Sequence, residues 1–281
     1  MDSIVALVWK HAQQEPGRPA LFFANQAITY GQLYADTEHF AQALIRWGLQ
    51  PGERVGLFLD NCPAFVTAYL GTHLAGGIAV LVNTQYRQVE LSHIMNDAGV
   101  RLCVTSANGA QELSGLSFPA LTTLVIVSDR ECASLSDTTE CITYAAFVAS
   151  EDSHLVFTYG TEPRQATMPV ASAPAVIAYT SGTTGKAKGA LLTHRNLTAN
   201  IMTVITAWGW TAQDRLLLTL PLFHAHGLMV GMHGTLFTGG SVVLRTKFDA
   251  SDVLATLKDD PDISLFFGVP TMYTRLLTEA A

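Results

Sequence analysis

Two hydrophobic periodicities alternate along this chain of 281 residues, and their alternation limits the possible fold more than any other feature. Residues 29–32 form a helix-capping pattern, and apolar residues follow it at helical spacing as far as Trp47. A turn at 51–54 then leads into 55–59, a short apolar run that is typical of a buried strand. Because helices that alternate with buried strands are typical of layered proteins, we predict an α/β fold.

The same periodicities place the other elements. Helices are predicted at 63–75, 87–98, 195–208, 226–237 and 250–258, with one more from residue 270 onward. Strands are predicted at 78–82, 101–105, 121–127, 175–180, 189–193, 215–219, 241–244 and 263–267. The intervening residues 128–170 are polar and weakly periodic, which indicates loops and small elements. We therefore predict two α/β subdomains, residues 1–170 and residues 171–281, the second of which is incomplete.

Charged residues are few in this sequence, and acidic ones outnumber basic ones. The chain has 16 Lys and Arg against 23 Asp and Glu, a net charge of −7, and 14% of its residues are charged. Such a composition excludes a disordered chain and indicates a large apolar core. The acidic balance leaves no basic face to neutralise phosphates, so nucleic acid is excluded as the main partner.

Two long uncharged stretches, 61–86 and 216–244, exceed the length of about 20 residues that a membrane span needs. Glycines interrupt both, and the second also contains Pro221 and three histidines, so we interpret them as buried α/β units and predict no membrane span. The four cysteines have no zinc-binding spacing, so no metal site is predicted. In the absence of a secretory signal, we expect reduced thiols and a cytoplasmic protein.

Residues 179–189 form the most informative segment, since they combine glycines and hydroxyl side chains with Lys186 and Lys188 between two predicted strands. Glycines bring backbone N–H groups close to a ligand, and lysines supply charge for a polyphosphate. The segment is not a Walker A loop, because Ala187 follows Gly185-Lys186 and Thr180 stands where the first glycine would be. The residues alone favour either a phosphate-binding loop or a flexible hairpin turn.

The sequence TSGTTGKAKG at 180–189, with ALLTHRN after it, resembles the phosphate-binding signature of the adenylate-forming superfamily. That superfamily includes acyl-CoA synthetases, luciferases and the adenylation domains of peptide synthetases. Other segments resemble its motifs in the expected order, namely 28–33, 75–77, 220–224 and 267–271. The resemblance covers essentially the whole chain, and it implies a layered αβαβα sandwich like the N-terminal domain of that superfamily, here truncated.

The resemblance also implies a two-step reaction with ATP, Mg²⁺ and coenzyme A. A carboxylate attacks the α-phosphorus of ATP and expels pyrophosphate, and the thiol of coenzyme A then displaces AMP from the acyl-adenylate. Lys188 and Thr184 are the implied catalytic residues, because charge on the departing pyrophosphate needs groups already in place. The implied phosphate-binding residues are Thr180, Ser181, Gly182, Thr183, Thr184, Gly185, Lys186 and Lys188.

The implied substrate is a small carboxylic acid. The segments 221–228 and 267–275 are most similar to those of malonyl-CoA synthetases, which implies that Arg275 holds the distal carboxylate of malonate and that His224 lines the acyl pocket. A fatty acid or an aryl acid is the alternative substrate, and Arg275 is then a solvated residue of a helix.

The resemblance finally implies that these residues correspond to about half of a relative. The acidic ligand of Mg²⁺, the aspartate that binds ribose and the C-terminal lid domain with its catalytic lysine have no counterpart in the sequence. We therefore expect residues 1–281 alone to form no acyl-CoA at a useful rate. The alternative to part of a ligase is a non-catalytic module that binds a nucleotide or an acyl group.

Overall fold

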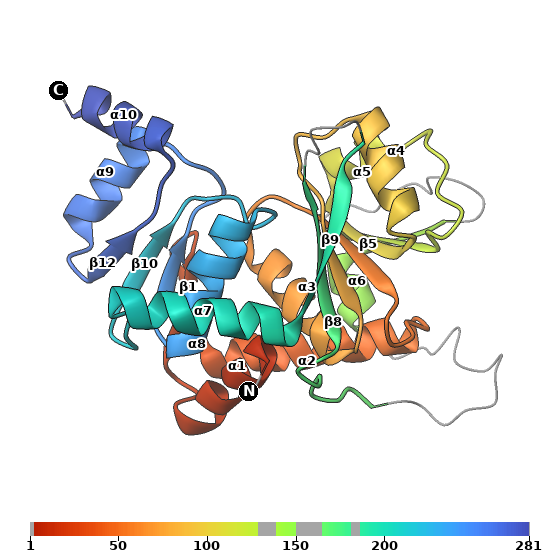
Figure 1. The fold of residues 1–281 in the computed structure, drawn as a ribbon, viewed down its shortest axis with the longest axis horizontal. Coiled ribbons are helices and arrows are strands. Elements are labelled where there is room, and N and C mark those ends of the chain that lie inside the picture. The colour runs from red at the N-terminus through yellow and green to blue at the C-terminus, as the bar shows by residue number, and fades with distance from the viewer. Residues whose placement is uncertain (1–2, 129–138, 150–164, 181–185, 281) are drawn as a thin grey trace.

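The computed structural model describes residues 3–128, 139–149, 165–180 and 186–280, and its strands form two sheets (Figure 1). The larger sheet has seven strands in the order β7-β6-β5-β3-β4-β8-β9, all parallel except β9, which is antiparallel to β8. These strands are β3 (Arg54–Phe58), β4 (Ile78–Leu81), β5 (Val100–Ser106), β6 (Thr123–Val127), β7 (Glu140–Thr143), β8 (Pro174–Thr180) and β9 (Lys188–Thr193).

The smaller sheet has five strands in the order β12-β10-β11-β1-β2. Its neighbours are parallel except β1 and β2, which form an antiparallel hairpin. The strands are β1 (Pro19–Phe23), β2 (Gln26–Thr29), β10 (Arg215–Leu218), β11 (Ser241–Leu244) and β12 (Ile263–Phe266).

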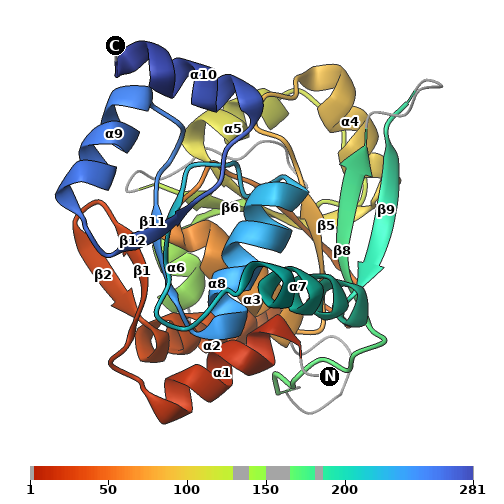
Figure 2. The same cartoon turned by 60° about the vertical axis from the view of Figure 1, so that its left-hand side comes forward.

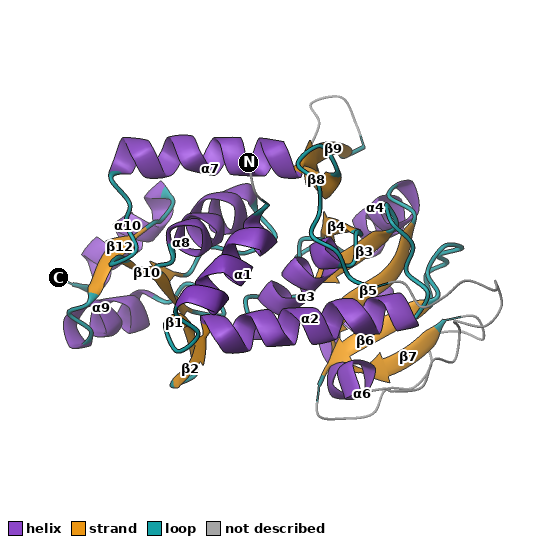
Figure 3. Cartoon of the chain, turned by 90° about the horizontal axis from the view of Figure 1, so that it is seen from below, coloured by secondary structure: helices purple, strands orange, loops and turns teal. Residues whose placement is uncertain are grey.

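Three hydrophobic clusters show how helices cover these sheets (Figures 1 and 3). One cluster joins the outer face of the seven-stranded sheet to α4 (Gln88–Asp97) and α5 (Ala107–Leu113). Another joins the outer face of the five-stranded sheet to α9 (Ala250–Asp259) and α10 (Pro270–Glu279). The largest cluster fills the layer between the sheets, which contains α1 (Ile4–Gln14), α2 (Tyr30–Arg46), α3 (Pro63–Leu74), α6 (Tyr144–Ala149), α7 (His194–Trp208) and α8 (His233–Thr238). The predicted layered αβαβα sandwich is confirmed.

The two uncharged stretches lie inside this core. The first contains α3, where every residue from Phe65 to Leu74 is buried, together with β4, so its apolar surface faces both sheets. The second contains β10, a short π-helix, α8 and β11. Among the described residues, no helix combines the length and the apolar character that crossing a membrane requires.

The structure differs from the predicted elements at 226–237. Instead of one α-helix, this segment forms a π-helix at His226–Met232 that continues into α8. A methyl group on residue 227 would lie 2.3 Å from the Pro221 carbonyl oxygen and 2.9 Å from that of Leu220, so Gly227 packs directly against the preceding turn. The wider π-turn accommodates this close approach, and apolar periodicity alone does not reveal such a contact.

The sheets do not follow the predicted division of the chain at residue 171. The hairpin of β1 and β2 belongs to the same sheet as β10 to β12, and β8 and β9 extend the sheet that begins with β3. Each side of residue 171 therefore contributes strands to both sheets. The sheet order does not test whether residues 1–170 and 171–281 are separate subdomains, and that division stays a prediction.

Three fully buried histidines gather between the sheets on α3, α7 and α8. The Tyr69 hydroxyl lies 2.9 Å from His233 Nε2, and the His73 ring packs edge-on against the rings of Tyr69 and His194 at 4.3 Å and 4.7 Å. The Nδ1 atoms of all three histidines lack a hydrogen-bond partner within the described chain. Burial lowers the pKa of His194 to about 4, that of His233 to about 3 and that of His73 well below its usual range.

This cluster predicts a protein that loses stability in mild acid. Between about pH 6.5 and pH 4, the unfolded chain binds protons at these three histidines and the folded chain does not. The free energy of unfolding therefore falls as the pH falls. We expect a loss of about 4 kcal/mol between about pH 7.5 and pH 5.5, measured by urea unfolding. His233→Gln keeps a polar group beside Tyr69 without titrating, and should reduce that loss by about 1.4 kcal/mol. An unchanged pH dependence in this variant would contradict the assignment.

Candidate functional site

The hairpin of β8 and β9 carries the segment that is predicted to bind phosphate. In its ladder, Thr180 pairs with Lys188 and Tyr179 pairs with Gly189. Thr180, Lys186 and Lys188 are described and exposed, so a hydroxyl and two cationic side chains meet solvent at one end of the hairpin. The other predicted residues lie outside the described residues, namely Ser181, Gly182, Thr183, Thr184 and Gly185.

Gly189 is needed because the Tyr179 ring lies across the hairpin at this position. A methyl group on residue 189 would lie 2.8 Å from Ile177 Cγ2 and 3.1 Å from Tyr179 Cζ. Contacts this short are not tolerated, so any larger residue would displace the ring. This glycine therefore serves the packing of the strand that leads into the loop.

One buried amide, which is not among the predicted site residues, fixes the segment around His224. Asn61 Nδ2 donates to the carbonyl oxygens of Leu220 at 2.9 Å and Arg245 at 3.0 Å, and Asn61 Oδ1 accepts from Leu222 N–H at 2.8 Å. Asn61 lies three residues after the end of β3 in the seven-stranded sheet, whereas its partners follow β10 and β11 of the other sheet. Asn61 thus ties the two sheets together, and its place at the carboxyl end of a parallel strand is the sequence signal that indicates it.

The segment predicted to line the acyl pocket, 221–228, lies close to the second segment, 267–275, near the π-helix. His224 is exposed, its ring packs edge-on against Phe223 at 4.7 Å, and partial burial lowers its pKa. Two residues further on, the His226 ring lies 6.2 Å from the ring of Phe267, which begins the second motif. The imidazole of His224 is therefore neutral and accessible at neutral pH, as suits a wall of a polar pocket.

Arg275 lies on α10, at the end of the second of these segments. Its guanidinium group sits over the Phe248 ring, 5.2 Å from the centroid, and it borders a surface depression of about 240 Å³ with Asp249 and Thr278. Hydrogen bonds from Ser251 and Asp252 lower the pKa of Asp249, and the charge of Arg275 adds to this effect. In the part of the chain that the structure describes, no hydrogen bond or ring contact joins Arg275 to His224.

The donors at the end of the hairpin fit the phosphates of a nucleotide. Thr180 supplies a hydroxyl group, and Lys186 and Lys188 supply charges that are open to solvent. The fit for Mg²⁺ is different, since the described residues contain no group of three His, Cys, Asp or Glu that is able to hold a metal ion. Binding of Mg²⁺ stays a prediction, and no chemical step below depends on it.

Known proteins are similar to this chain in sequence and in fold. The profile of the AMP-binding enzymes matches residues 8–281. A malonate–CoA ligase of Arabidopsis thaliana is 28% identical over 96% of this chain and 46% of its own length. A feruloyl-CoA synthase of an Amycolatopsis species is 30% identical over 95% of this chain and 48% of its own length.

A solved structure, that of ATP-bound MatB from Rhodopseudomonas palustris, superposes with a TM-score of 0.78 at 29% identity. The match covers 99% of this chain and 51% of that one. The chain therefore spans about half the length of the relatives that it matches.

Proposed function

The chain belongs to the family of AMP-binding enzymes, and on this premise we propose that the protein is an ATP-dependent carboxylate–CoA ligase. A carboxylate oxygen attacks the α-phosphorus of ATP, and the bond to the bridging oxygen of pyrophosphate breaks, which yields an acyl-adenylate. The sulfur of coenzyme A then attacks the acyl carbon, its proton is released, and AMP leaves with the former carboxylate oxygen. ATP and coenzyme A are substrates of these two steps.

The observation that carries this proposal is the hairpin of β8 and β9, which ends in Thr180, Lys186 and Lys188 beside the glycine-rich segment. The first step builds negative charge on the departing pyrophosphate. Cationic and hydroxyl donors held in place before the reaction stabilise that charge without reorganisation, which lowers the barrier. We assign this role to Lys188, with Thr184 as its partner in the loop and the remaining hydroxyl and backbone donors as phosphate ligands.

Because residues 1–281 alone are expected to form no acyl-CoA at a useful rate, the direct test uses the full-length parent protein. It supplies this protein with ATP, Mg²⁺, coenzyme A and one acid at a time, and identifies the products by mass spectrometry. We expect AMP and the matching acyl-CoA in equal amounts. ADP in place of AMP would contradict adenylate formation. Binding of ATP without AMP formation for any acid would favour the alternative, a module that binds a nucleotide or an acyl group without turnover.

For the substrate we propose malonate. The segments 221–228 and 267–275 support this choice through their resemblance to malonyl-CoA synthetases, and a malonate–CoA ligase is among the relatives. The similar identity to a feruloyl-CoA synthase keeps an aryl acid as the alternative, and a fatty acid remains a second one. The exposed His224 and the Phe267 motif would then border the acyl group of either kind of acid.

Arg275→Ala distinguishes these acids. If Arg275 turns from Phe248 to bind the distal carboxylate of malonate, its removal leaves that carboxylate without a charged partner. We expect kcat/KM for malonate to fall by about 30-fold, and that for butyrate to change by less than about twofold. Equal losses with both acids, measured in the same coupled AMP assay, would contradict the role of Arg275 and leave the aryl or fatty acid as the substrate.

A further inference from the structure

Helix α4 lies beside the end of the hairpin from which the predicted phosphate-binding loop departs (Figures 1 and 2). His93 Nε2 lies 2.8 Å from the carbonyl oxygen of Ala187, and the Tyr179 hydroxyl donates to Asp97 Oδ2 at 2.6 Å. Residues four positions apart share a helix face, so His93 and Asp97 form one contact surface. Tyr179 precedes the loop and Ala187 follows it. A single turn of α4 therefore contacts both ends of the loop.

The contact with Asp97 also orients the aromatic ring that packs on the hairpin. Burial, the hydrogen bond to Asp97 and the charge of Asp97 all raise the pKa of Tyr179. The phenol therefore stays protonated and donates a hydrogen bond to the carboxylate. The His93 ring meets the Tyr179 ring edge-on, with centroids 6.2 Å apart. Because the Ala187 oxygen accepts, His93 carries its proton on Nε2 in this contact. The two side chains of α4 and the Tyr179 ring thus form one connected unit over Gly189.

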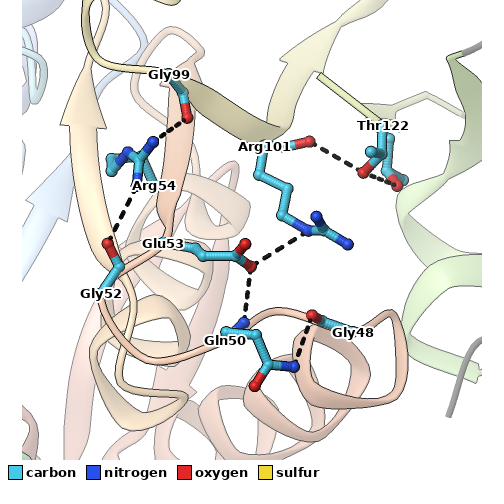
Figure 4. A network of polar contacts seen from close by, with 9 residues as sticks. Gly48, Gln50, Gly52, Glu53, Arg54, Gly99, Arg101 and Thr122 are labelled. Atoms are coloured by element: carbon cyan, nitrogen blue, oxygen red, sulfur yellow. Dashed lines mark hydrogen bonds and ion pairs between the residues drawn. The ribbon is translucent and has the colours of Figure 1, made fainter. Parts of the chain in front are cut away.

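Helix α4 is itself fixed to the body of the protein at both ends and along one face. At its C-terminal end, Arg54 donates to the carbonyl oxygen of Gly99 at 2.8 Å (Figure 4). Arg54 also donates to the carbonyl oxygen of Ala98. A cation at this end of a helix is favourable because the last carbonyl groups carry partial negative charge. At the other end, Glu90 accepts from the backbone N–H of Arg87. The inner face is buried in the sheet through Leu91, Ile94 and Met95.

We propose that His93 and Asp97 are positioning residues for nucleotide binding, which fix the two ends of the loop to α4 and so hold Lys186 and Lys188 ready for the phosphates. The identity of the ligand rests on the proposed function. The attachment of the two ends of the loop to α4 by His93 and Asp97, which we call the clamp, rests on the contacts alone. A hairpin end that is ordered before binding loses less conformational freedom when the phosphates arrive, so the affinity for ATP is higher. Neither residue needs to touch the nucleotide.

The test combines two readouts on the same variants, His93→Ala and Asp97→Asn. Amide hydrogen exchange of residues 186–192 reports the clamp without any ligand, and calorimetric titration with ATP reports its consequence. We expect exchange at these residues to accelerate about tenfold, and the Kd for ATP to rise by about tenfold. His93→Gln, which retains an N–H donor, should recover most of both properties. His39→Ala removes an exposed histidine of α2 and should change neither.

The outcomes separate the clamp from the proposed function. Unchanged exchange in both α4 variants would overturn the clamp. Faster exchange with an unchanged Kd for ATP would overturn the positioning role, since the contacts would then be structural only. If the unsubstituted protein failed to bind ATP, the proposed function and the positioning role would both fall, whereas the exchange result would still decide the clamp.

Discussion

In the full-length parent protein, Lys188→Ala should slow acyl-adenylate formation by about a hundredfold, which is the largest catalytic effect that we expect from a single substitution. The proposed reason is that Lys188, exposed at the start of β9, neutralises charge that appears on pyrophosphate only as it departs. Because this charge is greater in the transition state than in bound ATP, kcat should fall more than KM for ATP rises. A rapid-quench measurement of the first turnover, with ATP in excess, isolates the step.

The matched control is Lys258→Ala, which removes the same charge from an exposed position on α9. Its rate should stay within about twofold of the unsubstituted protein, because a solvated charge remote from the hairpin is screened. A similar loss in both variants would show that net charge is responsible. A normal first turnover in Lys188→Ala would remove this lysine from the mechanism.

Among the single substitutions, Asn61→Ala should cause the largest loss of stability, a decrease of about 3 kcal/mol in the free energy of unfolding. Asn61 is 1% exposed, and its amide satisfies the Leu220 and Arg245 carbonyl groups and the Leu222 N–H. Alanine removes the partner of all three groups, of which the Leu220 carbonyl and the Leu222 N–H are buried and the Arg245 carbonyl is partly buried. Asn61→Asp should be at least as damaging at neutral pH, because a carboxylate would face two carbonyl oxygens. Urea unfolding at neutral pH measures both changes.

Asn96→Ala provides the comparison, since the exposed Asn96 side chain makes one hydrogen bond within the described chain, to Ser117 O at 3.1 Å. It should cost less than about 0.5 kcal/mol. If Asn61→Ala proved equally mild, the account of Asn61 as a tie between the sheets would be wrong. Activity provides a second readout, since loosening the turn at Leu220–Leu222 should also disturb the His224 segment.

The layered fold follows from the sequence because burial imposes a period on each element. The uncharged stretch at 61–86 becomes α3 and β4, which face apolar neighbours on both sides. The π-helix at His226–Met232 does not follow, because apolar periodicity does not reveal the close packing of Gly227 against the turn that precedes the helix. The hairpin of β1 and β2 belongs to the sheet of β10 to β12 through a long-range strand pairing. Local periodicity carries no information on such a pairing.

The candidate site was predictable where its chemistry lies within one segment. Thr180, Lys186 and Lys188 form one hairpin end because the chain turns back on itself there. Asn61, His93 and Asp97 contact partners at least 82 positions away, and only the folded chain reveals their contribution. For Arg275 the position was predictable but the contact was not. Its match to a motif gives no information on the rotamer that stacks the guanidinium group over Phe248.

The central claim, adenylate formation at the hairpin of β8 and β9, is tested most directly by the exchange of labelled pyrophosphate into ATP. The reversal of the first step makes this exchange dependent on the carboxylic acid and independent of coenzyme A. In the full-length parent protein we predict exchange with malonate, ATP and Mg²⁺ in the absence of coenzyme A, and a loss of about a hundredfold in Lys188→Ala. The absence of exchange for every acid that is tested, from malonate to fatty and aryl acids, in a protein that binds ATP would contradict the account.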